Sequence, residues 1–335
     1  MSADTTVKEI IDGFPSQTDT FEVQRQEDLL LTRPDPGNLK LWSDPELLKV
    51  IHLPTKYIPA DFAPPKDVYG NDFLRLEWQQ MNNRQPFYHR NADVDEISYQ
   101  VTGTRTLSTE VGVLQLDPGD YTRIPVSVAH DNLGKEEVHI LFYVHGPTVE
   151  SGPVDRVAQA KLPPFEGWEG QIVVEMLTEC LGKPHCTIAV SQTDETVLLN
   201  RAKLENQEVM TAIRASAPGV CTGTEWMYQT KHVWIGHVRL NGADGKVYHR
   251  HRQADEIQYQ VSGTRTLVSQ HGVVELEPGD FVCIPRGCAF TSIARAESVH
   301  ICTLSSQEAL IEAKASKVAK QCSSALLAEV RKHQS

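Results

Sequence analysis

A phrase that occurs twice constrains the fold of this chain more than any other feature. The stretch YHRNADVDEISYQVTGTRT begins at Tyr88, and YHRHRQADEIQYQVSGTRT begins at Tyr248. Residues 88–130 align with residues 248–290 without a gap, at a constant offset of 160 positions. Self-similarity of this kind indicates a duplicated structural unit. We therefore expect two related halves.

Each copy consists of short segments rich in β-branched and aromatic residues, separated by Gly or Pro. Examples are DEISYQVTG, TRTLSTEVG, VGVLQLDPGD, YTRIPVSVAH and EVHILFYVHG. Segments of this length and punctuation predict an antiparallel sandwich or barrel. The DPGD and EPGD sequences predict tight turns in which Gly119 and Gly279 supply the positive φ.

The predicted strands have one polar and one apolar face, because residues two apart in a strand point the same way. His89 shares a face with Asn91, and Glu96 shares one with Gln100. Ile97, Tyr99 and Val101 point the other way, and the second copy repeats this pattern. We expect the polar side chains to line the barrel interior. The apolar face must then be covered by the other copy or by a partner.

Three residues of the first copy form a candidate metal set. His89 is followed seven positions later by Glu96, and His130 ends the strand predicted to begin with YTRIP. Two imidazoles and one carboxylate are the facial set that leaves positions open on non-heme Fe(II).

This pattern resembles the two motifs of the cupin superfamily, and the duplication resembles a bicupin. The resemblance covers both repeats, about half of the chain, and implies a mainly β fold of two cupin jelly-roll barrels with flanking helices. The YHRN sequence with Glu96 is similar to the metal motif of homogentisate dioxygenases, which implies iron ligation by His89, Glu96 and His130. The two-cupin plan resembles gentisate-type dioxygenases, although those have HxH where this chain has His89-Arg90-Asn91.

The second copy offers a different candidate set, His249, His251 and Glu256. Phe290 stands where the final His of the motif belongs. We expect this barrel to act as a scaffold, with these three residues as a second candidate metal site. His300 approaches that site only if its strand face points inward.

Three further residues of the first copy are candidates for catalysis. Asn91, beside the ligand His89, is expected to donate a hydrogen bond to substrate or bound oxygen, and Gln100 faces the metal side. Arg123 has no counterpart in the second copy and is a candidate to bind a substrate carboxylate. Arg90 should point away from the metal and form a structural ion pair, for instance with Asp95.

The remaining segments suggest five regions. They are an N-terminal arm (1–60), an N-terminal cupin (61–147), an intervening segment completing the barrels (148–230), a C-terminal cupin (231–305) and a C-terminal helix (306–335). Within the intervening segment, QIVVEML at residues 171–177 predicts a strand, and residues 195–216 predict a helix. The last region spaces its apolar residues as an amphipathic helix does.

Composition excludes several classes of partner. The formal charge is −12, from 32 Lys and Arg against 44 Asp and Glu, and no basic block suggests nucleic acid binding. No apolar stretch reaches the roughly 18 residues of a membrane span, and the start does not resemble a secretory signal. The seven Cys form no CxxC pair, which argues against a disulfide framework. We expect a cytoplasmic homo-oligomer.

The leading hypothesis is a non-heme Fe(II) dioxygenase that cleaves a small hydroxylated aromatic substrate with O₂ in the N-terminal barrel. Mn, Ni and Zn remain alternative metals. The alternative functions are a divalent-metal isomerase, lyase or decarboxylase that does not use O₂, and a non-catalytic metal-binding bicupin.

Overall fold

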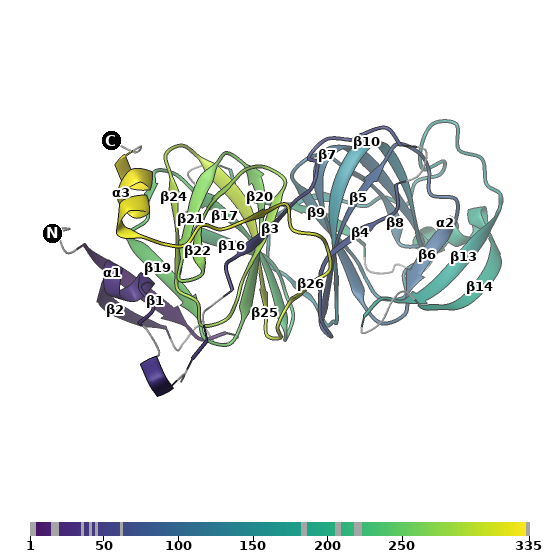
Figure 1. The fold of residues 1–335 in the computed structure, drawn as a ribbon. Helices are drawn as coiled ribbons and strands as arrows, with labels where there is room; N and C mark the ends of the chain where they lie inside the picture. Colours follow the sequence, from purple (N-terminus) through teal and green to yellow (C-terminus); the bar gives the residue numbers. More distant parts are fainter. Residues whose placement is uncertain are drawn as a thin grey trace.

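Two β-barrels lie side by side in the computed structural model (Figure 1). The structure describes residues 5–14, 20–34, 37–39, 42–43, 46–60, 63–181, 186–204, 209–217 and 223–332. None of the helices in these ranges is both long and apolar enough to span a membrane.

The N-terminal barrel is built mainly from residues 66–144 of the first copy. Its strands are β4 (Lys66–Gly70), β5 (Leu74–Met81), β6 (Tyr88–Asn91), β7 (Asp95–Thr109), β8 (Gly112–Leu116), β9 (Asp120–Ile124) and β10 (His130–Val144). The long strands β7 and β10 pair antiparallel over most of their length. The intervening segment adds β11 (Val149–Glu150), β12 (Val154–Val157), β13 (Ile172–Glu179), β14 (Cys186–Asp194), α2 (Glu195–Leu204) and β15 (Thr211–Arg214).

The C-terminal barrel repeats this plan. Its strands are β16 (Gly223–Gln229), β17 (Val233–Leu240), β18 (Ala243–Asp244), β19 (Val247–His251), β20 (Asp255–Ser262), β21 (Arg265–Ser269), β22 (Gly272–Leu276), β23 (Asp280–Ile284), β24 (Phe290–Ala294) and β25 (Ser298–Ser305). The fold-class prediction, two jelly-roll barrels in a mainly β chain, is confirmed. Gly119 and Gly279 have φ of 95° and 99°, as the turn prediction required.

The N-terminal residues pack on the C-terminal barrel. They form β1 (Thr6–Asp12), β2 (Phe21–Gln26), α1 (Glu27–Leu31), a 3₁₀ turn (Gly37–Leu39) and β3 (Lys49–His52). Strand β1 pairs parallel with β19, and β3 pairs with β23. In the other barrel β13 pairs parallel with β6, and β15 pairs with β9.

The hairpin, helix and strand β1-β2-α1-β3 is therefore the counterpart of β13-β14-α2-β15. The hairpin of each unit lies at the outer end of one barrel (Figure 1), whereas β3 and β15 extend to the core cluster between the barrels. Because β1 comes from the first half of the chain and β13 from the second half, the halves exchange these units. The duplication extends beyond the repeated phrase.

The apolar outer faces of the two copies pack against each other. Ile97, Tyr99 and Tyr121 of the first copy belong to one buried cluster with Ile257 and Tyr259 of the second. This confirms that the other copy covers the face opposite the polar interior.

Several predicted elements differ from the structure. The expected C-terminal helix at 306–335 is only α3 (Ser324–Lys332), because β26 (Leu310–Ile311) and β27 (Lys317–Val318) pair with β4 and β3. The helix predicted at 195–216 ends with α2, and β15 follows. In both places, pairing with a sheet edge outweighs local helix propensity. The strand at 171–177 is confirmed as β13.

Candidate metal centre

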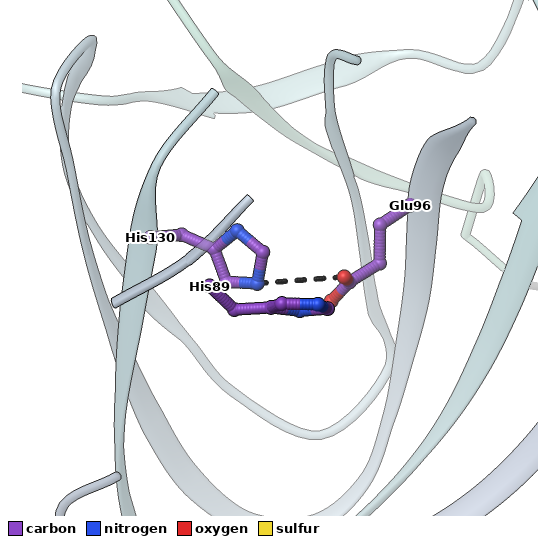
Figure 2. A group of neighbouring side chains, drawn as sticks. All are labelled: His89, Glu96 and His130. Atoms are coloured by element: carbon purple, nitrogen blue, oxygen red, sulfur yellow. Dashed lines mark ion pairs between the residues drawn. The ribbon is translucent and has the colours of Figure 1, made fainter. Parts of the chain in front are cut away.

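The three ligand-type residues of the first copy converge inside the N-terminal barrel. His89 on β6, Glu96 on β7 and His130 on β10 each offer a ligand atom, and these atoms lie within 4.8 Å of one another. His130 Nε2 is 3.4 Å from Glu96 Oε2 (Figure 2). Two ligands about 2.1 Å from one ion and at right angles to each other lie roughly 3 Å apart. The three residues fit a divalent cation.

Strand register brings these residues together. His130 begins β10 and does not end the preceding strand as predicted, which places it directly opposite His89 on β6. Glu96, near the start of β7, is opposite Tyr143 at the other end of β10. The sequence motif therefore positions its ligands on three strands whose inner faces converge.

The electrostatics favour an ionised carboxylate. Glu96 is 3% exposed and His130 is 1% exposed. Burial alone would raise the pKa of Glu96, but the neighbouring His130 and His89 and the amide of Asn91 lower that pKa well below its usual range. The site thus presents the anionic oxygen that a cation requires.

A backbone contact orients one imidazole of the set. His130 Nδ1 lies 3.3 Å from the carbonyl oxygen of Val128. If Nδ1 donates its proton there, Nε2 keeps a free lone pair directed toward Glu96. Second contacts of this kind orient metal-binding histidines in general.

Thr178 is a site residue that the sequence did not reveal. Its Oγ1 lies 2.6 Å from His89 Nε2, and the residue is 5% exposed. Thr178 reaches the site because β13 pairs parallel with β6, opposite Asn91. No motif marks this strand, so only the pairing could have identified it.

Asn91 lies at the site and contacts one of its candidate ligands. Its Nδ2 donates to Glu96 Oε2 at 2.9 Å, and its Oδ1 accepts from Cys180 Sγ at 3.1 Å. It is 1% exposed, and its amide orients the carboxylate of Glu96. The predicted hydrogen bond to substrate stays a prediction.

Gln100 lies on the inner face of its strand as predicted, whereas Arg123 does not. Gln100 is inside the barrel, but its amide donates to Glu137 Oε2 and to the Thr102 carbonyl, each at 2.9 Å. Arg123 is opposite Ile97 in the β7–β9 register, on the outer face, where it pairs with Asp95 and Glu150. Strand parity therefore keeps Arg123 away from the metal set.

Arg90 forms the structural ion pair that was expected, but with other partners. It pairs with Glu110 and Glu175, each at 2.6 Å, and not with Asp95. Its counterpart Arg250 pairs with Glu9. Since Glu175 is on β13 and Glu9 is on β1, each arginine joins a barrel to its exchanged hairpin.

A cavity of about 560 Å³ opens beside the metal set. Its wall includes His89 and Thr178, together with the buried Glu77 and Tyr143. The other lining residues are largely amides, aromatic residues and small apolar residues: Tyr57, Ala60, Ala63, Pro65, Gln79, Gln80, Met81, Asn82, Asn83, Gln85, Pro86, Phe87, Met176 and Thr187. Within the described lining there is no Lys or Arg.

The second candidate set does not converge in the same way. His251 Nε2 is 2.6 Å from Glu256 Oε2, whereas His249 contacts Asp12 of β1. The ring of Phe290 lies 6.1 Å from that of His249 and 5.9 Å from that of His251. An aromatic ring thus stands opposite His249 where the first copy places His130. Within the described residues, His249, His251 and Glu256 do not meet the distance criterion that the first set meets, and metal binding by this second set stays a prediction.

One other group in the described residues meets the same distance criterion. It consists of His52, Glu277 and Asp280. Asp280 is already bound by His52 Nδ1 at 2.9 Å and by Lys317 Nζ at 2.6 Å. The carboxylate of Asp280 is therefore already paired, and we interpret this group as a cluster of ion pairs.

Comparisons with known proteins find similarity at the level of structure. No protein-family model matches the chain. No curated protein matches it significantly. A cupin 2 conserved barrel domain protein from Leptotrichia buccalis is 6% identical, with a TM-score of 0.48 over 78% of this chain and 97% of that one.

Oxalate decarboxylase structures are also similar. One is 12% identical, with a TM-score of 0.47 over 79% of each chain. Another, from Bacillus subtilis and described by its Mn(II) centres, is 12% identical, with a TM-score of 0.45 over 78% of this chain and 79% of that one.

Proposed function

We propose that the N-terminal barrel is the catalytic unit of an enzyme that uses one divalent metal ion as a Lewis acid and does not consume O₂. The reaction class is that of an isomerase, lyase or decarboxylase. The observation that carries this proposal is a cavity that is lined by His89 of the metal set and also by a separate carboxylate, Glu77, and a phenol, Tyr143.

His89, Glu96 and His130 would hold the ion. A bound divalent cation polarises a substrate oxygen and makes a nearby hydroxyl or carbon-bound proton more acidic. Asn91 fixes the orientation of Glu96 through its 2.9 Å hydrogen bond. Thr178 contacts Nε2 of His89 and forms the cavity wall on that side.

Glu77 is suited to accept a proton from substrate. It is fully buried, and Arg75 Nη2 binds its Oε1 at 2.6 Å. Gln79 Nε2 donates to its Oε2 at 3.3 Å. These contacts fix the carboxylate in the cavity wall, as a general base requires.

Tyr143 is suited to donate a hydrogen bond. Burial, together with the nearby carboxylates Glu77 and Glu96, raises the pKa of Tyr143 well above its usual range. The phenol therefore keeps its proton and can stabilise an oxyanion that develops on substrate.

Apart from a carboxylate bound by the metal, the cavity composition favours neutral oxygen groups on the substrate. A substrate carboxylate would find no Lys or Arg among the described lining residues and could bind only the metal. The amides of Gln79, Asn82 and Asn83 can instead pair with hydroxyl and carbonyl groups.

Ring cleavage by an Fe(II) dioxygenase is the second candidate. Two histidines and one carboxylate leave positions open for both substrate and O₂. The YHRN sequence with Glu96 also resembles the motif of homogentisate dioxygenases. Because this candidate needs no general base, it gives Glu77 no catalytic role.

Turnover with and without oxygen separates the two candidates. Protein loaded with Mn(II) or Fe(II) is incubated with hydroxy ketones, vicinal diols, β-keto acids, catechols and hydroquinones. Products are identified, and oxygen consumption is measured with an oxygen electrode. The proposal predicts equal rates in anaerobic and aerobic buffer.

The proposal also predicts that Glu77→Gln lowers kcat by about 100-fold or more, in the range of general-base catalysis. The matched change Glu256→Gln, in the other barrel, should retain the rate. Oxygen uptake equal to product formation would establish the dioxygenase instead.

A further inference from the structure

The C-terminal barrel contains a cavity of about 580 Å³ that the metal chemistry does not use. Its wall is largely aromatic and aliphatic: Phe14, Trp226, Trp234, Val238, Leu240, Phe290, Cys302 and Leu304. The ring of Trp234 packs edge-on against those of Phe14 and Trp226, each with centroids 5.2 Å apart. Small-molecule sites are typically concave, apolar and of this size.

Polar side chains gather in one part of this wall. His251 is bonded to Glu256, and His249 contacts Asp12. Gln258 Nε2 donates to Glu256 Oε1 at 2.6 Å. The two carboxylates of this group are thus already paired within the protein.

Two residues that line the cavity, His251 and His300, each carry a buried imidazole nitrogen, Nδ1, without a hydrogen-bond partner among the described residues. His251 Nδ1 is 3.9 Å from Asp12 Oδ2, too far for a hydrogen bond. His300 is 4% exposed and lines the cavity. Buried polar atoms are rarely left unpaired, so these nitrogens point to a ligand that carries a hydrogen-bonding group.

The charges of the wall indicate a neutral ligand. No Lys or Arg is found among the described lining residues, so an anionic ligand would lack a partner. Among the described residues, three carboxylates line the cavity. Asp12 and Glu256 are occupied by His249 and His251, and Asp244 lies 3.8 Å from Lys246 Nζ, so each has a cationic or imidazole partner within the protein.

Phe290 accounts for the incomplete metal set in this barrel. In the first copy His130 completes the metal set from the strand opposite His89. In the second copy Phe290 is directly opposite His249 and adds its ring to the apolar wall. The same substitution removes a ligand and extends the hydrophobic cavity.

We propose that the C-terminal barrel is a metal-independent binding site for a small neutral aromatic compound that carries a hydroxyl or carbonyl group. The ring lies among Trp226, Trp234 and Phe290, and the oxygen pairs with the unpartnered imidazole nitrogens. This site is separate from the metal centre of the other barrel and does not depend on the reaction proposed there.

Calorimetric titration of the full chain with 2-naphthol tests this site. The proposal predicts one binding event per chain, unchanged by removal of metal with EDTA. It also predicts weaker binding of 2-naphthoate and of 1-naphthylmethylammonium, which carry a charge. Absence of binding at millimolar 2-naphthol, loss of binding with EDTA, or tighter binding of either charged probe would each overturn the proposal.

Matched cavity-filling variants locate the binding event. Val238 on β17 and Gln79 on β5 occupy equivalent wall positions in the two cavities. Val238→Phe should weaken 2-naphthol binding about tenfold or more, since it fills the proposed site. Gln79→Phe should leave the affinity within about twofold. The reverse pattern would place the ligand in the metal barrel.

A second variant keeps the test valid if Val238→Phe does not fold. His251→Gln removes an imidazole at the polar end and leaves the apolar wall intact. It should weaken 2-naphthol binding about tenfold, the expected loss of one hydrogen bond. Unchanged affinity would show that the polar end does not contact the ligand and would contradict the proposal.

Discussion

Thr178 and Asp12 occupy the same position in their respective barrels. Thr178 is opposite Asn91 in the β13–β6 register, and Asp12 is opposite His251 in the β1–β19 register. The repeated phrase differs at the same place, with Asn91 in one copy and His251 in the other. Each barrel thus combines a strand residue with a matching hairpin residue. Asn91 and Thr178 contact Glu96 and His89 in the first barrel, and His251 and Asp12 contact Glu256 and His249 in the second.

Replacing the hydroxyl of Thr178 tests its part in the metal centre. Thr178→Val keeps the shape of the side chain and removes the oxygen 2.6 Å from His89 Nε2. We expect Mn(II) affinity to fall roughly tenfold, in the range for residues that orient ligands. Competition titration with a chelating dye measures this. The control Asp12→Asn should retain the affinity, and equal losses in both variants would refute a specific role for Thr178.

Predictions for single residues were correct where the alternation of faces along one strand was sufficient. His89 and Glu96 belong to a single motif, and alternation of faces predicts that they point into the barrel. Arg123 was misplaced because its assignment rested on the absence of a counterpart in the second copy and not on its face. Its neighbour Tyr121, in the core between the barrels, shares its strand face and marks it as outward.

At the scale of elements, the exchanged hairpin units are attached by the same buried contacts in both barrels. Tyr88 donates to Glu195 at the start of α2, and Tyr248 donates to Glu27 at the start of α1. An arginine also pairs with each glutamate, Arg84 with Glu195 and Arg331 with Glu27. Local sequence could not reveal this, because partners more than 100 residues apart supply the contacts.

Removing one charge from each attachment should have different consequences for metal binding. Glu195→Gln and Glu27→Gln each weaken a buried hydrogen-bonded pair, and we expect each to lower the free energy of unfolding by about 1–3 kcal/mol. Only Glu195→Gln should also weaken metal binding, because α2 follows the hairpin that carries Thr178. Urea unfolding and metal titration of both variants measure the two effects. Equal metal affinity in the two variants would contradict the assignment of β13 to the metal centre.

At the scale of the whole molecule, the two barrels pack against each other through one buried apolar cluster. Their interiors differ: the first contains the candidate metal set and the second a largely apolar cavity. The sequence predicted the duplication, the barrel class and the covered apolar face. It could not predict which hairpin closes which barrel, since β1 and β19 pair in parallel although they lie in different halves of the chain. The boundaries drawn at residues 1–60 and 148–230 remain predictions.

The contact between the barrels should make stability depend on pH. His237 Nδ1 lies 3.1 Å from the hydroxyl of Tyr121 across the shared core. Burial, followed by the charge of Arg239, lowers the pKa of His237 to about 4. Between that value and the ordinary value near 6.5, the unfolded chain binds a proton that the folded chain does not. Stability is thus complete above pH 6.5 and falls as the pH drops toward 4.

The expected loss from this residue is roughly 3 kcal/mol across that interval. Urea unfolding of the wild type and of His237→Gln at pH 7 and pH 5 measures it. The variant should show a smaller decrease in stability than the wild type over this range. Identical pH dependence in both proteins would show that His237 is not a buried neutral imidazole.

The central claim, that only the N-terminal barrel holds metal, is tested most directly by metal content. Purified protein reconstituted with Mn(II) or Fe(II) is analysed by plasma mass spectrometry, together with the matched variants His89→Ala and His249→Ala. We predict one ion per chain in the wild type and in His249→Ala, and loss of that ion in His89→Ala. Two ions per chain, or an ion lost from His249→Ala and retained in His89→Ala, would contradict the account.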